Sequence, residues 1–256
     1  MMATMKEGPS RSPQKGCDPV FINALTYIGT MAAFLVAAFV REIKLHYFPA
    51  TGCLLPGPTD STFAQEENLK YLFIGLWELH FLRRTIEVLF VHDYKRKMSF
   101  TESLGAPLYY WFFAFWNGAA VRSENGYHPT YLPMASVGGV LFIIGEFGNC
   151  YCHYLLRSFR KAKRRSFLSK ESKHVIPSGF LFELVSCPHY FFEIVTWVGF
   201  VLTTWTLAAV VFLTASAITL FIYAHKKHKA YLMEFDGLAG RDLYPRNRKA
   251  LIPFLF

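Results

Sequence analysis

Residues 187–224 read CPHYFFEIVTWVGFVLTTWTLAAVVFLTASAITLFIYA, and the single Asp, Glu, Lys or Arg among them is Glu193. A bilayer core about 30 Å thick takes about 20 apolar residues in helical form, so this run is too long for one span. We expect it to form two helices, 187–205 and 206–224, joined by a tight turn. Helices are required because lipid offers no hydrogen-bond partner to an unpaired backbone group.

Four more apolar segments lie upstream of this pair. They span residues 21–40, 69–91, 107–121 and 131–156. Across the chain, 53% of residues are apolar and only 18% are charged, whereas soluble domains carry about 25% charged residues. The sequence therefore predicts an all-α fold, a polytopic membrane bundle of about six transmembrane helices. We divide it into a flexible polar tail over 1–20 and a transmembrane domain over 21–256.

The distribution of Lys and Arg favours six spans. Residues 1–20, 92–106, 157–180 and 225–256 share one side in that arrangement, and they hold 3, 3, 8 and 7 of the 27 Lys and Arg. The loops on the opposite side hold only 4 of them. Because cationic loops stay cytoplasmic, both termini are predicted to face the cytoplasm. The net charge of +9 then reflects topology, and nucleic acid is not expected as a partner.

The second span contains ionisable residues, and an unpaired charge there is costly, so a functional role is the default hypothesis. His80, Arg83, Arg84 and Glu87 follow the spacing of one helical face. One interpretation is a structural polar pair between Arg84 and Glu87 that holds the bundle together. The other is a polar pocket for an anionic ligand, since Arg suits both phosphate recognition and buried ion pairs.

The fourth span carries a second polar stripe. Glu146, Asn149 and His153 recur at helical spacing, and Arg157 and Arg160 continue the same face into a basic loop. A phosphate-rich cofactor or coenzyme A would find complementary charge there. For Lys163 to Lys173, we favour a solvated segment that only sets topology. For Asn149 and His153, which are polar within a span, we favour a functional role.

A metal site is not expected. The nine histidines are dispersed, and the two that come closest together, His225 and His228, lie beside lysines that would repel a cation. The five cysteines show neither a zinc spacing nor a redox C-x-x-C motif. In the fifth span, His189 and Glu193 are one turn apart, which permits a hydrogen-bonded pair.

Five motifs, taken in chain order, resemble one family. They are H-x-x-x-R-x-x-E-x-L-F-V-H at 80–92, N-x-x-x-H-x-x-L-R-x-x-R at 149–160, S-C-P-H-Y-x-x-E-x-x-x-W-x-G at 186–199, H-x-x-Y-L-x-x-F at 228–235 and YPRNRKALIPFLF at 244–256. Together they resemble the steroid 5α-reductase superfamily. They match its very-long-chain trans-2-enoyl-CoA reductase branch better than its steroid branch.

The resemblance implies a membrane bundle that binds NADPH and reduces an α,β-unsaturated lipid carbonyl, most closely a trans-2-enoyl-CoA in fatty acid elongation. It implies that Tyr190 donates a hydrogen bond to the substrate oxygen and that His80 belongs to the catalytic set. The residues that it assigns to the cofactor are Asn149, His153, Arg157, Arg160, Glu193, His228 and Tyr231. The implied partners are the lipid bilayer and an acyl-CoA or other lipid substrate, and the implied location is the endoplasmic reticulum membrane.

Four positions depart from the family pattern. Phe81 stands where the steroid enzymes carry a carbonyl-polarising tyrosine, and Thr26 falls where they carry a glutamate. His189 replaces an asparagine, and Val175 replaces a basic residue near the cofactor. Two interpretations therefore stay open. One is an active reductase, and the other is a non-catalytic member that serves as a structural subunit among other membrane subunits, including those of the mitochondrial inner membrane.

Overall fold

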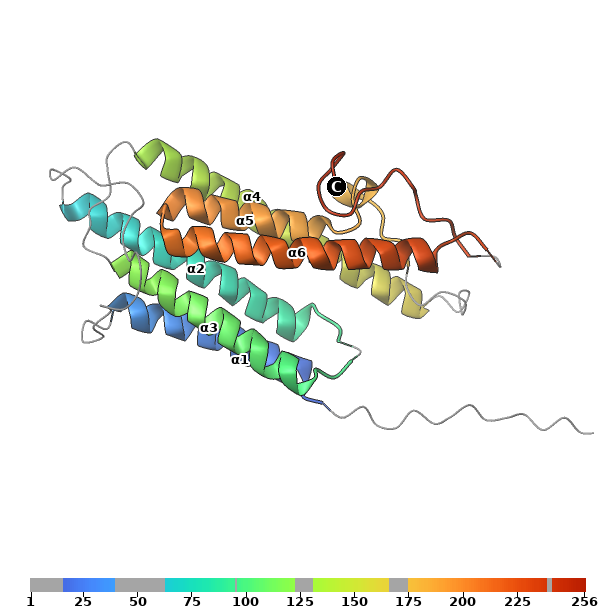
Figure 1. Cartoon of the computed structure of the whole chain (residues 1–256), viewed down its shortest axis with the longest axis horizontal. Helices are drawn as coiled ribbons and strands as arrows, with labels where there is room; N and C mark the ends of the chain where they lie inside the picture. The colour runs from blue at the N-terminus through green and yellow to red at the C-terminus, as the bar shows by residue number, and fades with distance from the viewer. Residues whose placement is uncertain (1–15, 40–62, 95, 123–130, 166–174, 239–240) are drawn as a thin grey trace, which may run out of the picture.

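The computed structural model describes residues 16–39, 63–94, 96–122, 131–165, 175–238 and 241–256. Within these ranges the chain forms α-helices and one short 3₁₀ helix (Figure 1). They are α1 (Pro19–Phe39), α2 (Phe63–Phe90), α3 (Phe100–Arg122), α4 (Tyr131–Arg165), η1 (Phe180–Glu183), α5 (Pro188–Thr204) and α6 (Leu207–Glu234). The β pairings found there are isolated bridges, so the predicted all-α fold is confirmed. Most of the predicted polar tail lies outside the described residues.

Three of the helices are long and apolar enough to cross a bilayer by composition alone. They are α1, residues Pro133–Lys163 of α4, and α6. The other three run alongside them (Figure 1), although α2 carries charged residues and α5 has only 17 residues. The chain is thus a multi-pass helical membrane protein, as predicted.

The long apolar run folds as the predicted helical hairpin. After Thr204, Trp205 takes the left-handed conformation (φ 46°, ψ 43°), and its N–H donates to the Val201 carbonyl at 2.7 Å. Thr206 then caps α6, its side chain accepting a hydrogen bond from the Ala209 N–H at 3.3 Å. A left-handed residue followed at once by an N-cap residue reverses the chain in a very short turn.

Helix ends differ from the prediction in two ways. The predicted third span was too short, because α3 already begins at Phe100, after a capping box. The Ser99 N–H donates to the Glu102 carboxylate at 2.8 Å, and the Glu102 N–H donates to Ser99 Oγ at 3.3 Å. In addition, α4 and α6 continue past their apolar residues to Arg165 and Glu234, since Lys, Arg, Glu and Leu are good helix formers.

One end of the bundle brings together parts of the four basic segments. Figure 1 shows the starts of α1, α3 and α5 and the ends of α2, α4 and α6 at this end. Hydrogen bonds join these segments in two pairs: Cys17 pairs with Met98 in both directions at 3.0 Å, and Arg248 donates to the Pro177 carbonyl at 2.6 Å. The grouping agrees with six spans, while the cytoplasmic orientation stays a prediction.

Glycines allow two pairs of helices to pack closely. On α5, Gly199 lies so near α4 that an added Cβ would overlap the Phe142 backbone. On α3, Gly118 lies against the Phe34 carbonyl of α1 in the same way. Small residues of this kind let membrane helices approach. Trp77 of α2 links the two pairs, because it stacks on Phe34 at 4.9 Å and contacts aromatic rings of α5 and α6.

Candidate active site

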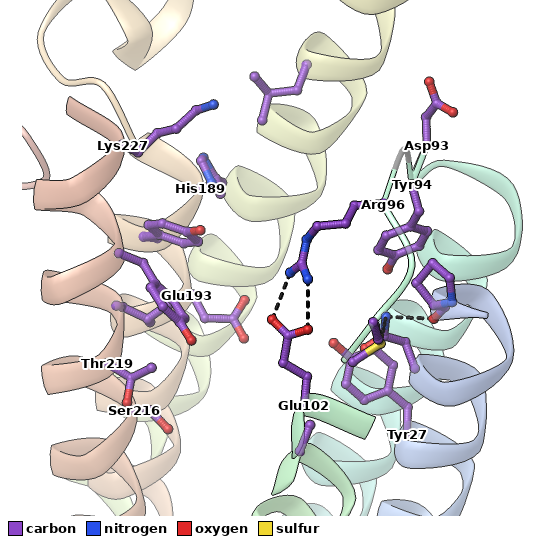
Figure 2. A pocket seen from close by; sticks show the side chains of 18 of the residues that line it. Tyr27, Asp93, Tyr94, Arg96, Glu102, His189, Glu193, Ser216, Thr219 and Lys227 are labelled. Atoms are coloured by element: carbon purple, nitrogen blue, oxygen red, sulfur yellow. Dashed lines mark hydrogen bonds and ion pairs between the residues drawn. The ribbon is translucent and has the colours of Figure 1, made fainter. Parts of the chain in front are cut away.

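A cavity of about 1270 Å³ lies between the two closely packed helix pairs. One wall comes from α1 and α3, and the facing wall comes from α5 and α6 (Figure 2). The hydroxyl, amide and carboxylate residues on these two walls are Asn23, Tyr27, Thr101, Glu102, Tyr109, Tyr110, Tyr190, Glu193, Ser216, Thr219, Tyr223 and Tyr231. Trp197 and Phe212 add apolar rings. The cavity therefore offers polar groups on both sides of an apolar interior.

The cavity extends from the basic end of the bundle into the apolar layer. Its lining residues on α6 range from Tyr231 to Phe212, which corresponds to roughly 28 Å at the rise of an α-helix. The cations that line it are Arg96, Arg160, Lys163 and Lys227. Arg96 is paired with Glu102 at 2.7 Å. A ligand with a phosphate-bearing end and an apolar tail matches this distribution of charge.

Behind the cavity wall, charged residues of α2 and α4 form a buried ion-pair network. Arg83 contacts Glu146 at 2.5 Å and Glu87 at 2.6 Å, and Arg84 contacts Glu87 at 2.6 Å. His80 Nδ1 lies 2.6 Å from Glu146. Of the two interpretations of this helix face, the structure favours the structural one. The predicted Arg84–Glu87 pair is present, and both arginines are matched by carboxylates.

The network reaches the cavity at two points. His80 Nε2 lies 3.3 Å from Glu193, which lines the cavity from α5. Arg84 donates a hydrogen bond to the hydroxyl of Tyr27, which lines the cavity from α1, at 3.2 Å. His80 itself is 1% exposed and does not line the cavity. His80 thus contacts Glu193 rather than the cavity, and its catalytic role stays a prediction.

Two residues predicted to bind the cofactor belong to the buried network and do not line the cavity. Asn149 accepts a hydrogen bond from Arg83 at 2.8 Å and donates one to the His189 carbonyl at 2.7 Å. His153 Nδ1 lies 2.9 Å from Glu87. Both side chains are buried, so they join α2, α4 and α5 to one another. Direct contact with a cofactor stays a prediction for both.

The two arginines of the predicted cofactor set lie at the basic end. Arg157 donates to the Phe90 carbonyl at the end of α2, and Arg160 donates to the Asp93 carbonyl at 3.4 Å. Arg160 lines the main cavity, and both arginines line a second cavity of about 170 Å³. They therefore tie α4 to the segment after α2 and place positive charge beside the mouth of the main cavity.

The C-terminal segment positions His228 and Tyr231. Tyr231 lines the cavity and stacks on Tyr244, with ring centroids 5.5 Å apart. Ser186 Oγ lies 2.6 Å from His228 Nδ1 and 2.7 Å from the Tyr244 hydroxyl. His228 does not line the cavity. Tyr244, the first residue of the terminal motif, therefore braces the end of α6 where Tyr231 meets the cavity.

The predicted donor Tyr190 lines the cavity from α5, one turn before Glu193. The His189 ring lies beside it, with ring centroids 4.2 Å apart. The pair that the sequence permits between His189 and Glu193 is not formed, because Glu193 contacts His80 instead. Among the described residues, His189 Nδ1 is buried without a hydrogen-bond partner.

Two of the departures from the family pattern lie behind the cavity wall. Phe81 is fully buried among aromatic rings, and Thr26 is 1% exposed, with its hydroxyl bonded to the Ile22 carbonyl at 2.7 Å. A glutamate at Thr26 would therefore be buried. Val175, by contrast, does line the cavity at its basic end, together with the cations named above.

Sequence reasoning missed several residues that line the cavity. They are Tyr27, Tyr94, Arg96, Tyr110 and Lys227. None of them is a defining position of a quoted family motif. Tyr27 and Tyr110, which lie within predicted spans, are surrounded by mostly apolar residues. One signal was available, because a phenol inside a membrane span usually finds a polar partner.

Glu87, His92 and His153 offer ligand atoms within 4.8 Å of one another in the part of the chain that the structure describes. Burial, followed by the nearby Arg84 cation, lowers the pKa of His92 to about 3, which keeps this imidazole neutral. However, Arg83 and Arg84 already pair with Glu87, and their charges oppose a metal cation. The geometry therefore favours ion pairing at this cluster.

Fold and site together define a multi-pass helical membrane protein whose cavity has a basic mouth, an apolar interior and a buried charged network behind its wall. The family described as 3-oxo-5-alpha-steroid 4-dehydrogenase matches residues 96–256. The chain belongs to this steroid 5α-reductase family, as its motifs predicted.

Relatives in this family include enzymes of both branches. The chain is 38% identical over 203 residues to a very-long-chain enoyl-CoA reductase of Dictyostelium discoideum, covering 77% of this chain and 61% of the relative. A probable very-long-chain enoyl-CoA reductase of Caenorhabditis elegans is 34% identical over 187 residues, covering 70% and 56%. The mouse 3-oxo-5-alpha-steroid 4-dehydrogenase 1 is 31% identical over 231 residues, covering 86% and 80%. The chain spans about three fifths of the length of the first two.

Proposed function

We propose that this protein is an NADPH-dependent reductase of an α,β-unsaturated lipid carbonyl, most closely a trans-2-enoyl-CoA of fatty acid elongation. The observation that carries the proposal is a single cavity that joins a cationic mouth to an apolar interior, with Tyr190 and Glu193 on its wall. The names of two relatives, both enoyl-CoA reductases, agree with this substrate class.

The cavity is larger than a typical site for one small molecule. Sites for one small molecule commonly measure about 300–1,000 Å³, and this cavity measures about 1270 Å³. NADPH and coenzyme A both carry phosphates, which suit the side chains of Arg160, Lys163 and Lys227 at the mouth. These cations supply positive charge where Val175 offers none. When bound, NADPH supplies the hydride.

Tyr190 is the residue that we propose to polarise the substrate. A phenol is neutral at working pH, so its hydroxyl donates a hydrogen bond to the thioester oxygen and stabilises the enolate charge that develops during reduction. Glu193, one turn away and held by His80 at 3.3 Å, offers a fixed acceptor to hydroxyl or amide groups of the cofactor.

The test is NADPH oxidation by the purified protein in detergent, with trans-2-hexadecenoyl-CoA as substrate. Tyr190→Phe is expected to lower turnover about 10²–10³-fold, the usual effect of losing one such donor. NADPH affinity, measured by fluorescence, should stay nearly unchanged. Tyr154→Phe is the matched control, because Tyr154 is exposed on α4 and does not line the cavity.

Two results would contradict this proposal. Unchanged turnover in Tyr190→Phe would remove Tyr190 from the mechanism. No NADPH binding by the wild-type protein would contradict the reductase and favour the structural-subunit alternative.

We also propose the endoplasmic reticulum membrane as the location, on the basis of the family. Fractionation of cells that express a tagged full-length chain would test this assignment. A signal confined to the mitochondrial inner membrane would contradict it and would support the structural-subunit alternative.

A further inference from the structure

Tyr27 places a phenol on the cavity wall opposite Tyr190. It lies on α1, is 7% exposed and lines the cavity. Figure 2 shows it on the other side of the cavity from Glu193. Its ring centroid lies 5.8 Å from that of Phe81 and 5.7 Å from that of Tyr110. The Tyr27 hydroxyl can therefore form a hydrogen bond at the cavity, whereas the Phe81 ring buried behind it cannot.

The hydrogen bond between Arg84 and Tyr27 has only one possible direction. A guanidinium carries donors and no acceptor, so Arg84 donates and the Tyr27 oxygen accepts, at 3.2 Å. This bond leaves the hydroxyl proton of Tyr27 unused. Within the part of the chain that the structure describes, no acceptor is found for that proton. A ligand in the cavity is then its natural acceptor.

Arg84 also strengthens and fixes this donor. A hydroxyl that accepts a hydrogen bond from a cation is polarised, which strengthens the bond that it donates. The same guanidinium lies 5.5 Å from the centroid of the Tyr27 ring. It is held in turn by Glu87 at 2.6 Å. The phenol is therefore positioned by the buried network before any ligand arrives.

We propose that Tyr27 is a second carbonyl-binding residue, which donates its hydroxyl proton in a hydrogen bond to the carbonyl oxygen of the substrate. The proposal rests on the reductase function, because it assumes a carbonyl ligand in this cavity. A carbonyl oxygen has two lone pairs, so a hydrogen bond from Tyr27 does not use up its capacity to accept a second one. The contact makes and breaks no covalent bond.

The test compares a thioester with a thioether in the absence of NADPH. The purified full chain is titrated with S-hexadecanoyl-coenzyme A and with its S-hexadecyl analogue, which lacks the carbonyl oxygen. Tyr27→Phe is expected to weaken thioester binding about tenfold, which corresponds to the net value of one hydrogen bond, and to leave thioether binding unchanged. An equal effect on both ligands, or no effect on either, would overturn the proposal.

A spectroscopic measurement keeps the proposal testable if Tyr27→Phe lowers the yield of folded protein. The thioester carbonyl is labelled with carbon-13, and its infrared stretch is recorded on the folded fraction from size exclusion. Hydrogen bonding lowers this frequency, so the shift on binding should be smaller in Tyr27→Phe than in the wild type. Tyr154→Phe should keep the wild-type shift. The same shift in all three proteins would overturn the role of Tyr27.

The two proposals fail in different ways. If NADPH oxidation persists and Tyr27→Phe keeps the wild-type preference for the thioester, the reductase stands and the role of Tyr27 is overturned. If the protein does not bind NADPH and its preference for the thioester still depends on Tyr27, the carbonyl contact stands and the reductase is overturned.

Discussion

At the scale of single residues, Glu87 is the centre of the buried network. Its carboxylate lies 2.6 Å from both Arg83 and Arg84 and 2.9 Å from His153, and the residue is 2% exposed. Removing one partner of a buried ion pair costs about 3–5 kcal/mol, because the charge left behind stays desolvated. With three partners on one carboxylate, the loss of one is partly offset by the other two.

Arg84→Ala should therefore lower the free energy of unfolding by an amount near the lower end of that range. It should reduce the yield of folded protein and lower its thermal midpoint in detergent. The matched control is Arg246→Ala, since Arg246 is an exposed basic residue near the C-terminus. Thermal scans and size exclusion provide the measurement. Equal tolerance of the two substitutions would show that the pair does not stabilise the bundle.

Glu183 anchors the C-terminal segment outside the membrane spans. The Gly179 N–H donates to its carboxylate at 2.5 Å, and Arg248 lies 2.9 Å away. The Gly179 hydrogen bond first, and then the Arg248 cation, hold the pKa of Glu183 below its usual value of 4.5. A lowered pKa in the folded state means that the carboxylate stabilises the fold fully above the usual value, and that this contribution is lost as the pH falls through the folded value.

Glu183→Gln should therefore reduce the difference between the thermal midpoints at about pH 7 and about pH 3, relative to the wild type. The effect will be small, because Glu183 is more than half exposed and the pair is screened by solvent. Differential scanning fluorimetry at both pH values measures it. Identical differences in the variant and the wild type would exclude Glu183 as an acid-sensitive anchor.

At the scale of elements, glycine positions decide which helices pack closely. On α4, an added Cβ at Gly145 would overlap backbone atoms of Thr196 and Phe192 on α5, whereas Gly139 has no atom within 4 Å. One helix therefore carries a glycine that the packing requires and another that it does not.

Gly145→Ala should destabilise the protein by about 1–3 kcal/mol, because α4 and α5 must move apart. Gly139→Ala on the same helix should be neutral or up to about 1 kcal/mol more stable, since Ala favours the helix over Gly. Thermal midpoints in one detergent compare the two. A midpoint for Gly145→Ala that equals or exceeds that of Gly139→Ala would disprove the close contact.

Hydropathy alone predicts most of these elements but not their ends. The helices follow from the apolar runs, and the reversal at Trp205 follows from the length of one run. The start of α3 was missed because it depends on the capping pair Ser99 and Glu102, which hydropathy does not register. At the site, a motif marks Tyr190. Nothing local marks Tyr27, whose role depends on a contact with a residue 57 positions away.

At the scale of the whole molecule, the grouping of basic segments predicts the orientation in the membrane. Ser178 lies at the basic end, whereas Pro133 lies at the start of α4, at the other end, and both are exposed. In a cysteine-free background, an impermeant maleimide added from the cytoplasmic side of sealed vesicles should label Ser178→Cys and not Pro133→Cys. Labelling of both from that side would contradict the topology.

The cavity between two closely packed helix pairs also bears on how long a copy of the protein survives. Protein interiors are normally filled by side chains, and here about 1270 Å³ is left for ligands. A ligand that binds only the folded state stabilises it by about 2.7 kcal/mol when the ligand concentration is 100 times its Kd. This stabilisation is similar in size to the destabilisation caused by truncating a buried side chain in the core. When its ligands are scarce, less of the protein would stay folded in the membrane. The abundance of the protein would then follow the supply of its ligands without a separate regulator.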